Sequence, residues 1–186
     1  YASWGRAANK HVPDILPYVS DTPSPMAITA KKCKEQFAGD PVVFIGPCIA
    51  KRKEGRENPD VDWVMTFEEL ACLLNAWNIP VVECDNIPLS ESIDENSRKY
   101  CLSGGVAAAV QSQSKHPIEV QAVNGLDKKQ LRMLSNYART KKAEGQLIEV
   151  MACEGGCIAG PCSHEFPKDA KRFFAQNSEK FCTCAH

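Results

Sequence analysis

Short apolar runs alternate with amphipathic segments along most of the chain. Runs rich in β-branched and other large apolar residues predict buried strands at 42–45, 61–65, 118–123 and 147–151, with 79–83 as a further candidate. Segments with helical spacing predict helices at 3–12, 25–37, 66–78, 104–113, 126–143 and 168–176. Because strands and helices alternate, the pattern favours an α/β fold with a mixed or mostly parallel sheet and flanking helices.

Local signals mark the ends of several helices. Ser24 precedes a proline and is a typical N-cap, and Thr66 with Glu69 matches a capping box. The helix after this box is expected to bury Leu70, Leu73, Leu74 and Trp77. The helix at 104–113 is expected to pack through Val106, Ala109 and Val110. The charged segment 51–59 and the polar segment 85–102 are expected to be loops.

The composition excludes several classes of protein. Of the 186 residues, 44% are hydrophobic and 24% are charged, which is typical of a soluble globular protein. A formal net charge of −1 favours neither nucleic acid nor an anionic membrane as a partner. No apolar run is long enough to cross a bilayer, and the segment from Tyr1 is not a signal peptide. Because Tyr1 stands where an initiator methionine would, we expect a fragment or a processed chain.

The chain contains ten cysteines, a high number for its length. In a small secreted domain they would indicate a disulfide framework, but this chain is large enough to bury a core without cross-links. The sequence therefore favours a reduced metalloprotein of the cytoplasm, with a periplasmic protein as the alternative.

Three of these cysteines follow predicted strands within glycine-rich turns. Cys48 follows the strand at 42–45, and Cys153 and Cys157 follow the strand at 147–151 with two glycines between them. Thiolates are the ligands that iron–sulfur clusters select, and open α/β folds bind ligands at the carboxyl ends of strands. The pattern predicts an iron–sulfur cluster held by these cysteines, because the intervening glycines let both sulfurs of the second turn face one point.

The two turns resemble the signatures of the iron–iron hydrogenases. Residues 46–54 are similar to the family's Pro-Cys-x-x-Lys-x-x-Glu, and residues 149–160 are similar to its Glu-x-Met-x-Cys-x-Gly-Gly-Cys-x-x-Gly. The order of the two signatures also agrees, and the resemblance starts near Trp4. It implies one or two lobes like those of the hydrogenase catalytic domain over 1–160, followed by a helix and a cysteine-rich tail at 161–186.

The resemblance also implies a cofactor and a reaction. A cubane 4Fe–4S cluster, joined through a cysteine sulfur to a two-iron unit with carbon monoxide and cyanide ligands, would interconvert hydrogen with two protons and two electrons. Cys48 and Cys153 would bind the cubane, and Cys157 would bridge the two units. Lys51 would donate to a cyanide ligand, and Met151 would pack beside the two-iron unit.

Two serines and a glutamate match further positions of the family. Ser24 lies in a Ser-Pro-Met segment whose serine relays protons, and Ser103 opens a helix beside the cluster. Glu54 is expected to pair with a nearby base. Simpler interpretations stay open: a plain helix cap for Ser24, a solvated lysine for Lys51 and a core residue for Met151. The remaining cysteines before the second turn are expected to be small buried hydrophobes: Cys33, Cys72, Cys84 and Cys101.

The sequence departs from the family's pattern at three places. Tyr1 and Ala2 stand where Cys-Pro is expected, so the fourth cubane ligand comes from an upstream segment, comes from another chain or is lost. The cysteine that delivers protons in catalytic relatives is absent too, so the isolated chain is predicted to be inactive. Gly46 replaces the methionine of catalytic relatives, which favours a sensory relative. After Gly160 the family's glycines and proline give way to a different sequence.

Three functions therefore stay open. The first is a hydrogenase domain from an anaerobe, the second a non-catalytic hydrogen or redox sensor with a similar cluster, and the third a structural α/β module that binds zinc or no metal. Expected partners are a ferredoxin-like electron-transfer domain or protein, the upstream segment and a second copy of the chain; nucleic acid and membranes are not expected. The tail is expected either to form a separate zinc or iron–sulfur site or to be disordered, its candidate ligands being Cys162, His164, Cys182 and Cys184.

Overall fold

The structure is a computed structural model that describes residues 2–85, 95–163 and 167–177. A first lobe comprises α2 (Pro25–Gln36), β1 (Val43–Gly46), α3 (Lys51–Glu57), β2 (Trp63–Thr66) and α4 (Phe67–Ala76). A second lobe comprises α6 (Gly105–Gln113), β3 (Val120–Asn124), α7 (Lys128–Thr140) and β4 (Leu147–Met151). The remaining helices are α1 (Ala2–His11), α5 (Glu95–Arg98) and α8 (Pro167–Asn177). Within the described ranges, no helix combines the length and the apolar character needed to span a membrane.

Each lobe contains one two-stranded parallel sheet. In the first sheet β1 pairs with β2, with Val43 opposite Trp63. In the second sheet β3 pairs with β4, with Val120 opposite Leu147. The α/β class with parallel strands and flanking helices is therefore confirmed, although the described strands form two small sheets.

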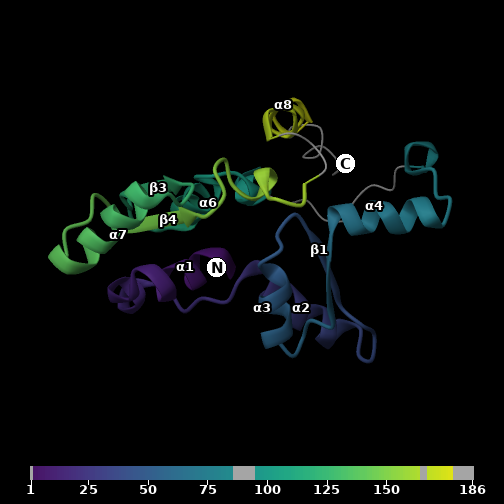
Figure 1. The fold of residues 1–186 in the computed structure, drawn as a ribbon, viewed down its shortest axis with the longest axis horizontal. Coiled ribbons are helices and arrows are strands. Elements are labelled where there is room, and N and C mark those ends of the chain that lie inside the picture. Colours follow the sequence, from purple (N-terminus) through teal and green to yellow (C-terminus); the bar gives the residue numbers. More distant parts are fainter. Residues whose placement is uncertain (1, 86–94, 164–166, 178–186) are drawn as a thin grey trace.

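The hydrophobic core is divided between the lobes. Met26 and Ala30 of α2 pack with Val61 in the first lobe. The second lobe's core joins α1 and the 3₁₀ turn Pro13–Tyr18 to β3 and α7, through Ala8, Val12, Ile15, Val123, Leu134 and Ala138. Figure 1 shows α1 beneath β3, β4 and α7, so the first helix of the sequence belongs to the second lobe in space.

Two local expectations are wrong. Residues 51–57 form helix α3, because Gly55 lets the helix approach β2 until a Cβ would lie 2.6 Å from Val64 Cγ2. Of the charged residues in this helix, Lys53, Arg56 and Glu57 are exposed, whereas Lys51, Arg52 and Glu54 are partly buried. Val81–Glu83 forms a 3₁₀ turn in place of a strand, and Val82 is 96% exposed.

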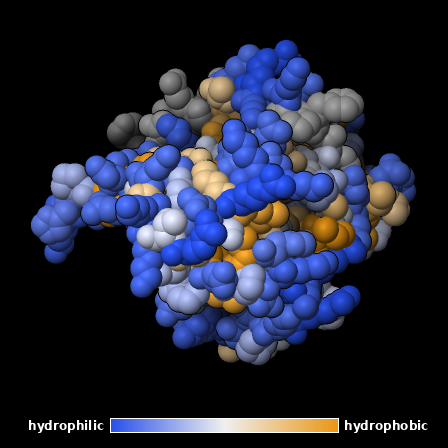
Figure 2. Space-filling model, turned by 60° about the vertical axis from the view of Figure 1, so that its left-hand side comes forward, coloured by the Kyte–Doolittle hydropathy of each residue, from blue (hydrophilic) through white to orange (hydrophobic). Residues whose placement is uncertain are grey.

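The apolar faces of two helices are covered differently than expected. The capping box of Thr66 and Glu69 is confirmed, but no residue of α4 is fully buried and Trp77 is 65% exposed. Helix α6 is buried through Gly105, Ala107 and Ala109, so the expected packing of Ala109 is confirmed, whereas Val106 is only partly buried and Val110 is exposed. Figure 2 shows apolar side chains exposed near the centre of one face. Of the segment expected to be a loop at 85–102, residues 86–94 lie outside the described residues, and 95–101 are helical.

Gly55 gives a test of how α3 is held. Gly55→Ala gains about 1 kcal/mol of helix propensity but forces overlap with Val64, and such overpacking costs about 1–3 kcal/mol. We therefore expect a net loss of stability in urea unfolding. Val64→Ala should relieve the overlap, so the double variant should be more stable than the sum of the single effects. A simple sum would contradict the close packing.

Candidate metal-cluster site

The two cysteine turns meet between the lobes. Cys48 follows β1 and Cys153 follows β4, so both leave the carboxyl end of a strand. The Cys162 N–H donates to the Pro47 carbonyl at 3.2 Å. A Cβ at Gly160 would lie only 2.5 Å from the same oxygen, so only glycine fits against Pro47 without a shift. The end of the second turn thus lies directly against the residue that precedes Cys48.

The three motif thiols lie close enough to influence one another. Burial raises the pKa of Cys157, and the charge of Cys48 raises it further. The pKa of Cys153 is also raised, first by burial and then by the charges of Cys48 and Cys157. The structure therefore brings the three predicted cysteines together, while their role as ligands stays a prediction.

The arrangement does not suit a single metal ion. Among the described residues, no three Cys, His, Asp or Glu side chains are placed to hold one. A cubane differs because its four irons take four thiolates, so the ligands surround a larger volume. The raised pKa values of Cys153 and Cys157 are compatible with such a cluster, whose iron would replace the protons of these thiols.

The second turn is fixed by contacts on both sides. The Gly155 N–H donates to Asn124 Oδ1 at 2.5 Å, at the end of the neighbouring strand β3. The Gly155 carbonyl accepts the Ser103 N–H at 3.3 Å. Gly156 has φ +95°, and a Cβ there would overlap the Cys101 carbonyl oxygen. The turn therefore requires glycine both for its backbone conformation and for the close approach of residues 101–103.

Glu149 connects this strand to helix α6. Its carboxylate is 8% exposed and accepts the N–H groups of Gly104 and Ala107, each at 2.7 Å. A carboxylate at a helix N-terminus satisfies unpaired N–H groups and interacts favourably with the helix dipole. Glu149 begins the second motif, but its contacts with α6 could not be predicted from the motif. The available signal was a charged residue inside an apolar strand.

Ser103 lies where these contacts meet. Its Oγ is buried and finds no hydrogen-bond partner in the described part of the chain. Buried hydroxyls are normally paired, so an unpaired one beside the cysteine turn is suited to a bound group. A hydroxyl could donate to an anionic cluster or to its ligands, which fits the predicted cofactor.

Lys51 lies at the first turn in a hydrogen-bonded cluster with Glu54 and Ser24. Lys51 Nζ donates to Glu54 Oε1 at 2.9 Å, to Glu54 Oε2 at 2.8 Å and to Ser24 Oγ at 3.2 Å. The side chains of Lys51 and Glu54 are only 16% and 19% exposed, so the solvated-lysine interpretation is wrong. The pairing expected for Glu54 is confirmed. Burial raises the pKa of Cys157 whereas the Lys51 charge lowers it, which places the ammonium near that thiol.

Ser24 combines a structural contact with a polar one. Its Oγ accepts the Ala27 N–H at 3.3 Å, which confirms the predicted cap of α2. The same hydroxyl donates to Glu54 and accepts from Lys51, so it contacts both other members of the cluster. Its function as a proton relay stays a prediction.

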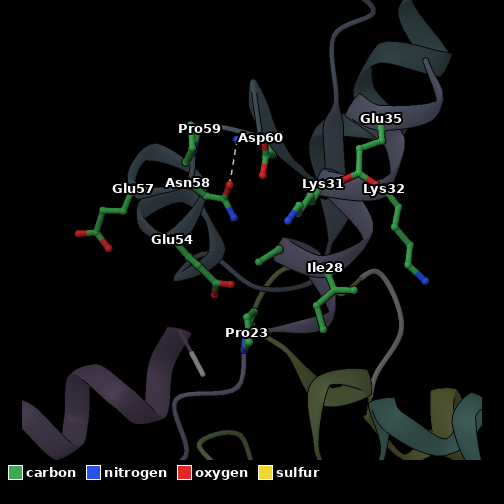
Figure 3. Close-up of a pocket in the computed structure, with 11 residues that line it drawn as sticks. Pro23, Ile28, Lys31, Lys32, Glu35, Glu54, Glu57, Asn58, Pro59 and Asp60 are labelled. Carbon is green, nitrogen blue, oxygen red and sulfur yellow. Dashed lines mark hydrogen bonds between the residues drawn. The ribbon is translucent and has the colours of Figure 1, made fainter. Parts of the chain in front are cut away.

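A cavity of about 760 Å³ reaches Glu54 from the outside, between α2 and α3. Figure 3 shows Glu54 on one side and Lys31 on the other, with Asn58, Asp60 and Pro59 along the α3 side. The cavity therefore gives solvent access to the carboxylate that binds Lys51.

The other residues named from the sequence differ in how deeply they are buried. Met151 ends β4 and is partly buried, and the Ser3 hydroxyl lies 3.8 Å from Cys48 Sγ. The four cysteines expected to be buried differ: Cys72 and Cys84 are exposed, whereas Cys33 and Cys101 are partly buried. Of the predicted tail site, Cys162 is buried, and His164, Cys182 and Cys184 lie outside the described residues.

Phe44 occupies the space beside Gly46. A Cβ at Gly46 would lie 2.9 Å from Phe44 Cε1, and Lys51 Nζ lies 5.8 Å from the centre of the same ring. An aromatic ring thus occupies space that a larger residue 46 would need.

Comparisons with known proteins place these features in context. The family model of the iron-only hydrogenase large subunit, C-terminal domain, matches residues 2–161. Iron hydrogenase 1 of Clostridium pasteurianum is 25% identical over 91% of this chain and 38% of its own length. The NADP-reducing hydrogenase subunit HndD of Solidesulfovibrio fructosivorans is 28% identical over 84% of this chain and 35% of its own. The chain thus spans well under half of these relatives.

Solved structures support the same fold. A structure described as revealing stepwise [FeFe]-hydrogenase H-cluster assembly has a TM-score of 0.65 and 17% identity, over 95% of this chain and 63% of that chain. A second, on the oxygen inactivation of an [FeFe]-hydrogenase, has a TM-score of 0.61 and 15% identity over 96% of this chain and 63% of that chain. At this identity the likeness establishes the fold alone.

Glu149 gives a stability test at the site. Glu149→Gln keeps the shape but replaces one acceptor oxygen with an amide that cannot accept the N–H of Gly104 or Ala107. Leaving a buried N–H unpaired costs about 1–3 kcal/mol, which urea unfolding should measure. The matched control is Glu119→Gln, an exposed residue next to the same sheet. Equal stability of both variants would show that the buried carboxylate does not hold α6.

A pH prediction follows from the raised pKa values of Cys153 and Cys157. A raised pKa means that the fold favours the neutral thiol, so stability is complete below the ordinary thiol pKa of 9.0 and is lost as pH rises through the folded values. We expect the Tm of the reduced, metal-free protein to fall less in Cys157→Ser than in the wild type above about pH 9. Cys72→Ser, at an exposed site, should follow the wild type. Parallel curves for all three proteins would contradict the prediction.

Proposed function

Because this chain belongs to the family of the iron-only hydrogenase large subunit, C-terminal domain, over residues 2–161, we propose that it binds the iron–sulfur cofactor of a hydrogenase and takes part in the interconversion of hydrogen with protons and electrons. When bound, the cofactor would supply the electrons and the iron site at which hydrogen reacts. Cys48, Cys153 and Cys157 would be its ligands, and the chain's other groups would hold it and control protons.

One observation carries this proposal: the two cysteine turns come from different lobes and meet. The Pro47 carbonyl accepts the Cys162 N–H, and the charge of Cys48 contributes to the raised pKa of Cys157, after the larger effect of burial. A structural module would need neither the glycine at position 160 nor this gathering of thiols from two lobes. The arrangement has a clear use if a multi-iron cluster binds between the lobes.

The groups around the cysteines would orient the cofactor. Ser103 has an unpaired buried hydroxyl that can donate to it, and Lys51 holds an ammonium near Cys157. An ammonium and a hydroxyl both favour an anionic group, and their donors are fixed before it binds. Met151 would contribute apolar contact from the end of β4.

The Lys51, Ser24 and Glu54 cluster can conduct a proton between the site and solvent. In the outward direction Lys51 Nζ gives a proton to Ser24 Oγ while Ser24 gives its own to Glu54. Glu54 then releases a proton into the cavity between α2 and α3. Inward transfer reverses each step, so the hydroxyl both caps α2 and relays the proton. A ferredoxin-like protein is the electron partner that we propose.

A sensory function is the second candidate, and Phe44 is the observation that favours it. The ring fills the space at Gly46 next to Lys51, where catalytic relatives carry a methionine. A site with altered packing could bind hydrogen and report on it without efficient turnover. Both functions require the same cluster ligands.

Anaerobic reconstitution with iron and sulfide tests the cluster. We expect the wild type to bind about four irons per chain, and Cys48→Ser, Cys153→Ser and Cys157→Ser each to bind less iron and lose absorbance. Cys72→Ser is the control, because this cysteine is exposed on α4, in the first lobe. Equal iron content in all the variants would refute the ligand assignment.

Loading a synthetic two-iron complex then separates catalysis from sensing. Hydrogen evolution from a reduced viologen indicates a hydrogenase, whereas infrared bands of the carbonyl ligands that shift under hydrogen without turnover indicate a sensor. A loaded protein whose bands are insensitive to hydrogen would contradict both. Without loading, we expect the isolated chain to evolve no hydrogen.

A further inference from the structure

A lysine from helix α8 lies against the second cysteine turn. This helix follows residues 2–161, which the family model matches, and it contacts the 3₁₀ turn Cys157–Ala159. Figure 1 shows α8 above the segment that follows β4. A Cβ at Gly155 would lie 2.5 Å from Lys171 Nζ and 2.7 Å from Lys171 Cε. The ammonium group of Lys171 therefore rests directly on the backbone of the turn.

This contact lies midway between two of the predicted ligands. Gly155 is separated by two residues from Cys153 and by two residues from Cys157. Because consecutive Cα atoms are about 3.8 Å apart, the Gly155 Cα lies no more than about 7.6 Å from the Cα of either cysteine. The ammonium group of Lys171 is thus placed at the centre of the segment that carries both thiols.

The helix that carries this lysine is anchored to the protein along one side. Ala170 and Phe174, which lie about one turn apart, are partly buried, whereas Lys168 and Phe173 are exposed. A backbone fixed in this way limits the positions that the Lys171 side chain can reach. The long apolar stem of a lysine can lie along the protein surface while its charged end stays in contact with water.

Among the described residues, no carboxylate pairs with Lys171. Its Nζ takes part in no ion pair or hydrogen bond there, whereas Asp169 of the same helix pairs with Arg172 at 3.2 Å. The ammonium group of Lys51 differs, because both carboxylate oxygens of Glu54 accept from it. The charge of an ion pair is largely cancelled a short distance away, while an unpaired charge acts on its surroundings. Lys171 therefore contributes a positive charge that no described side chain offsets.

We propose that Lys171 stabilises the reduced state of the iron–sulfur cluster through its charge, and so raises the reduction potential of the cluster. This inference rests on the proposed function. Reduction transfers one electron from a ferredoxin-like protein to the cluster, and no bond of the protein forms or breaks. The cluster becomes more negative by one charge, which a nearby cation favours. Net charge is one of the factors that set the potential of such clusters.

The experiment compares Lys171→Gln, Lys171→Glu and Lys171→Arg with the wild type after anaerobic reconstitution with iron and sulfide. The matched control is Lys142→Gln, at an exposed lysine beyond the end of α7. Every sample contains the same concentration of a small thiol, because the two motifs provide three cysteines. Iron content and urea unfolding of the metal-free proteins establish that loading and folding are equal. The reduction potential is measured by dithionite titration, followed by electron paramagnetic resonance at low and high salt.

We expect the potential to fall in Lys171→Gln and to fall further in Lys171→Glu, because the first removes a positive charge and the second replaces it with a negative one. Lys171→Arg keeps the charge, so its potential should stay near that of the wild type, as should the potential of Lys142→Gln. High salt should reduce the differences between the variants, because it screens an exposed charge.

Equal potentials in Lys171→Gln and Lys142→Gln would overturn the inference while leaving the three-cysteine site intact. A potential in Lys171→Arg that falls as far as in Lys171→Gln would also overturn it, because the effect would then not depend on the charge. If the wild type binds no cluster at all, the proposed function fails and the inference fails with it.

Discussion

The contact between Pro47 and the end of the second cysteine turn determines the rest of the site. The Pro47 carbonyl accepts the Cys162 N–H, and Gly160 packs against the same residue. Because Pro47 immediately precedes Cys48, this contact sets the distance between thiols that come from different lobes. Each lobe alone carries only part of the cysteine set on the end of its own strand. A change at this contact would alter the arrangement of the thiols without changing a cysteine.

Hydrogen bonds between polar groups around the site connect one element to another. Glu149 joins β4 to the start of α6, and Asn124 joins β3 to the second turn. Lys51, Glu54 and Ser24 join α3 to the cap of α2. Each contact satisfies a buried donor or charge, so moving one element leaves a polar group unpaired at a cost comparable to a lost hydrogen bond. The site is therefore held in place by polar contacts within the protein itself.

Features set by nearby residues could be predicted from the sequence. The strands at β1 and β4, the Ser24 cap and the Thr66 capping box depend on local periodicity and side-chain chemistry. Features set by distant packing could not. Helix α3 forms because Gly55 fits against Val64, and Cys101 reaches the second turn because Gly156 leaves room for it. Neither close contact is indicated by the residues of its own segment. The two separate sheets escaped prediction because strand pairing is a long-range property as well.

The placement of α1 has a consequence for how the protein is made. Ala8 lies 0% exposed in a core whose other members include Leu134 and Ala138. During synthesis α1 leaves the ribosome long before those partners, while the first lobe can already pack α2 against β1 and β2. The apolar face of α1 therefore stays uncovered until β3 and α7 have been synthesised. A chaperone that shields apolar surface during synthesis would act on this face of α1.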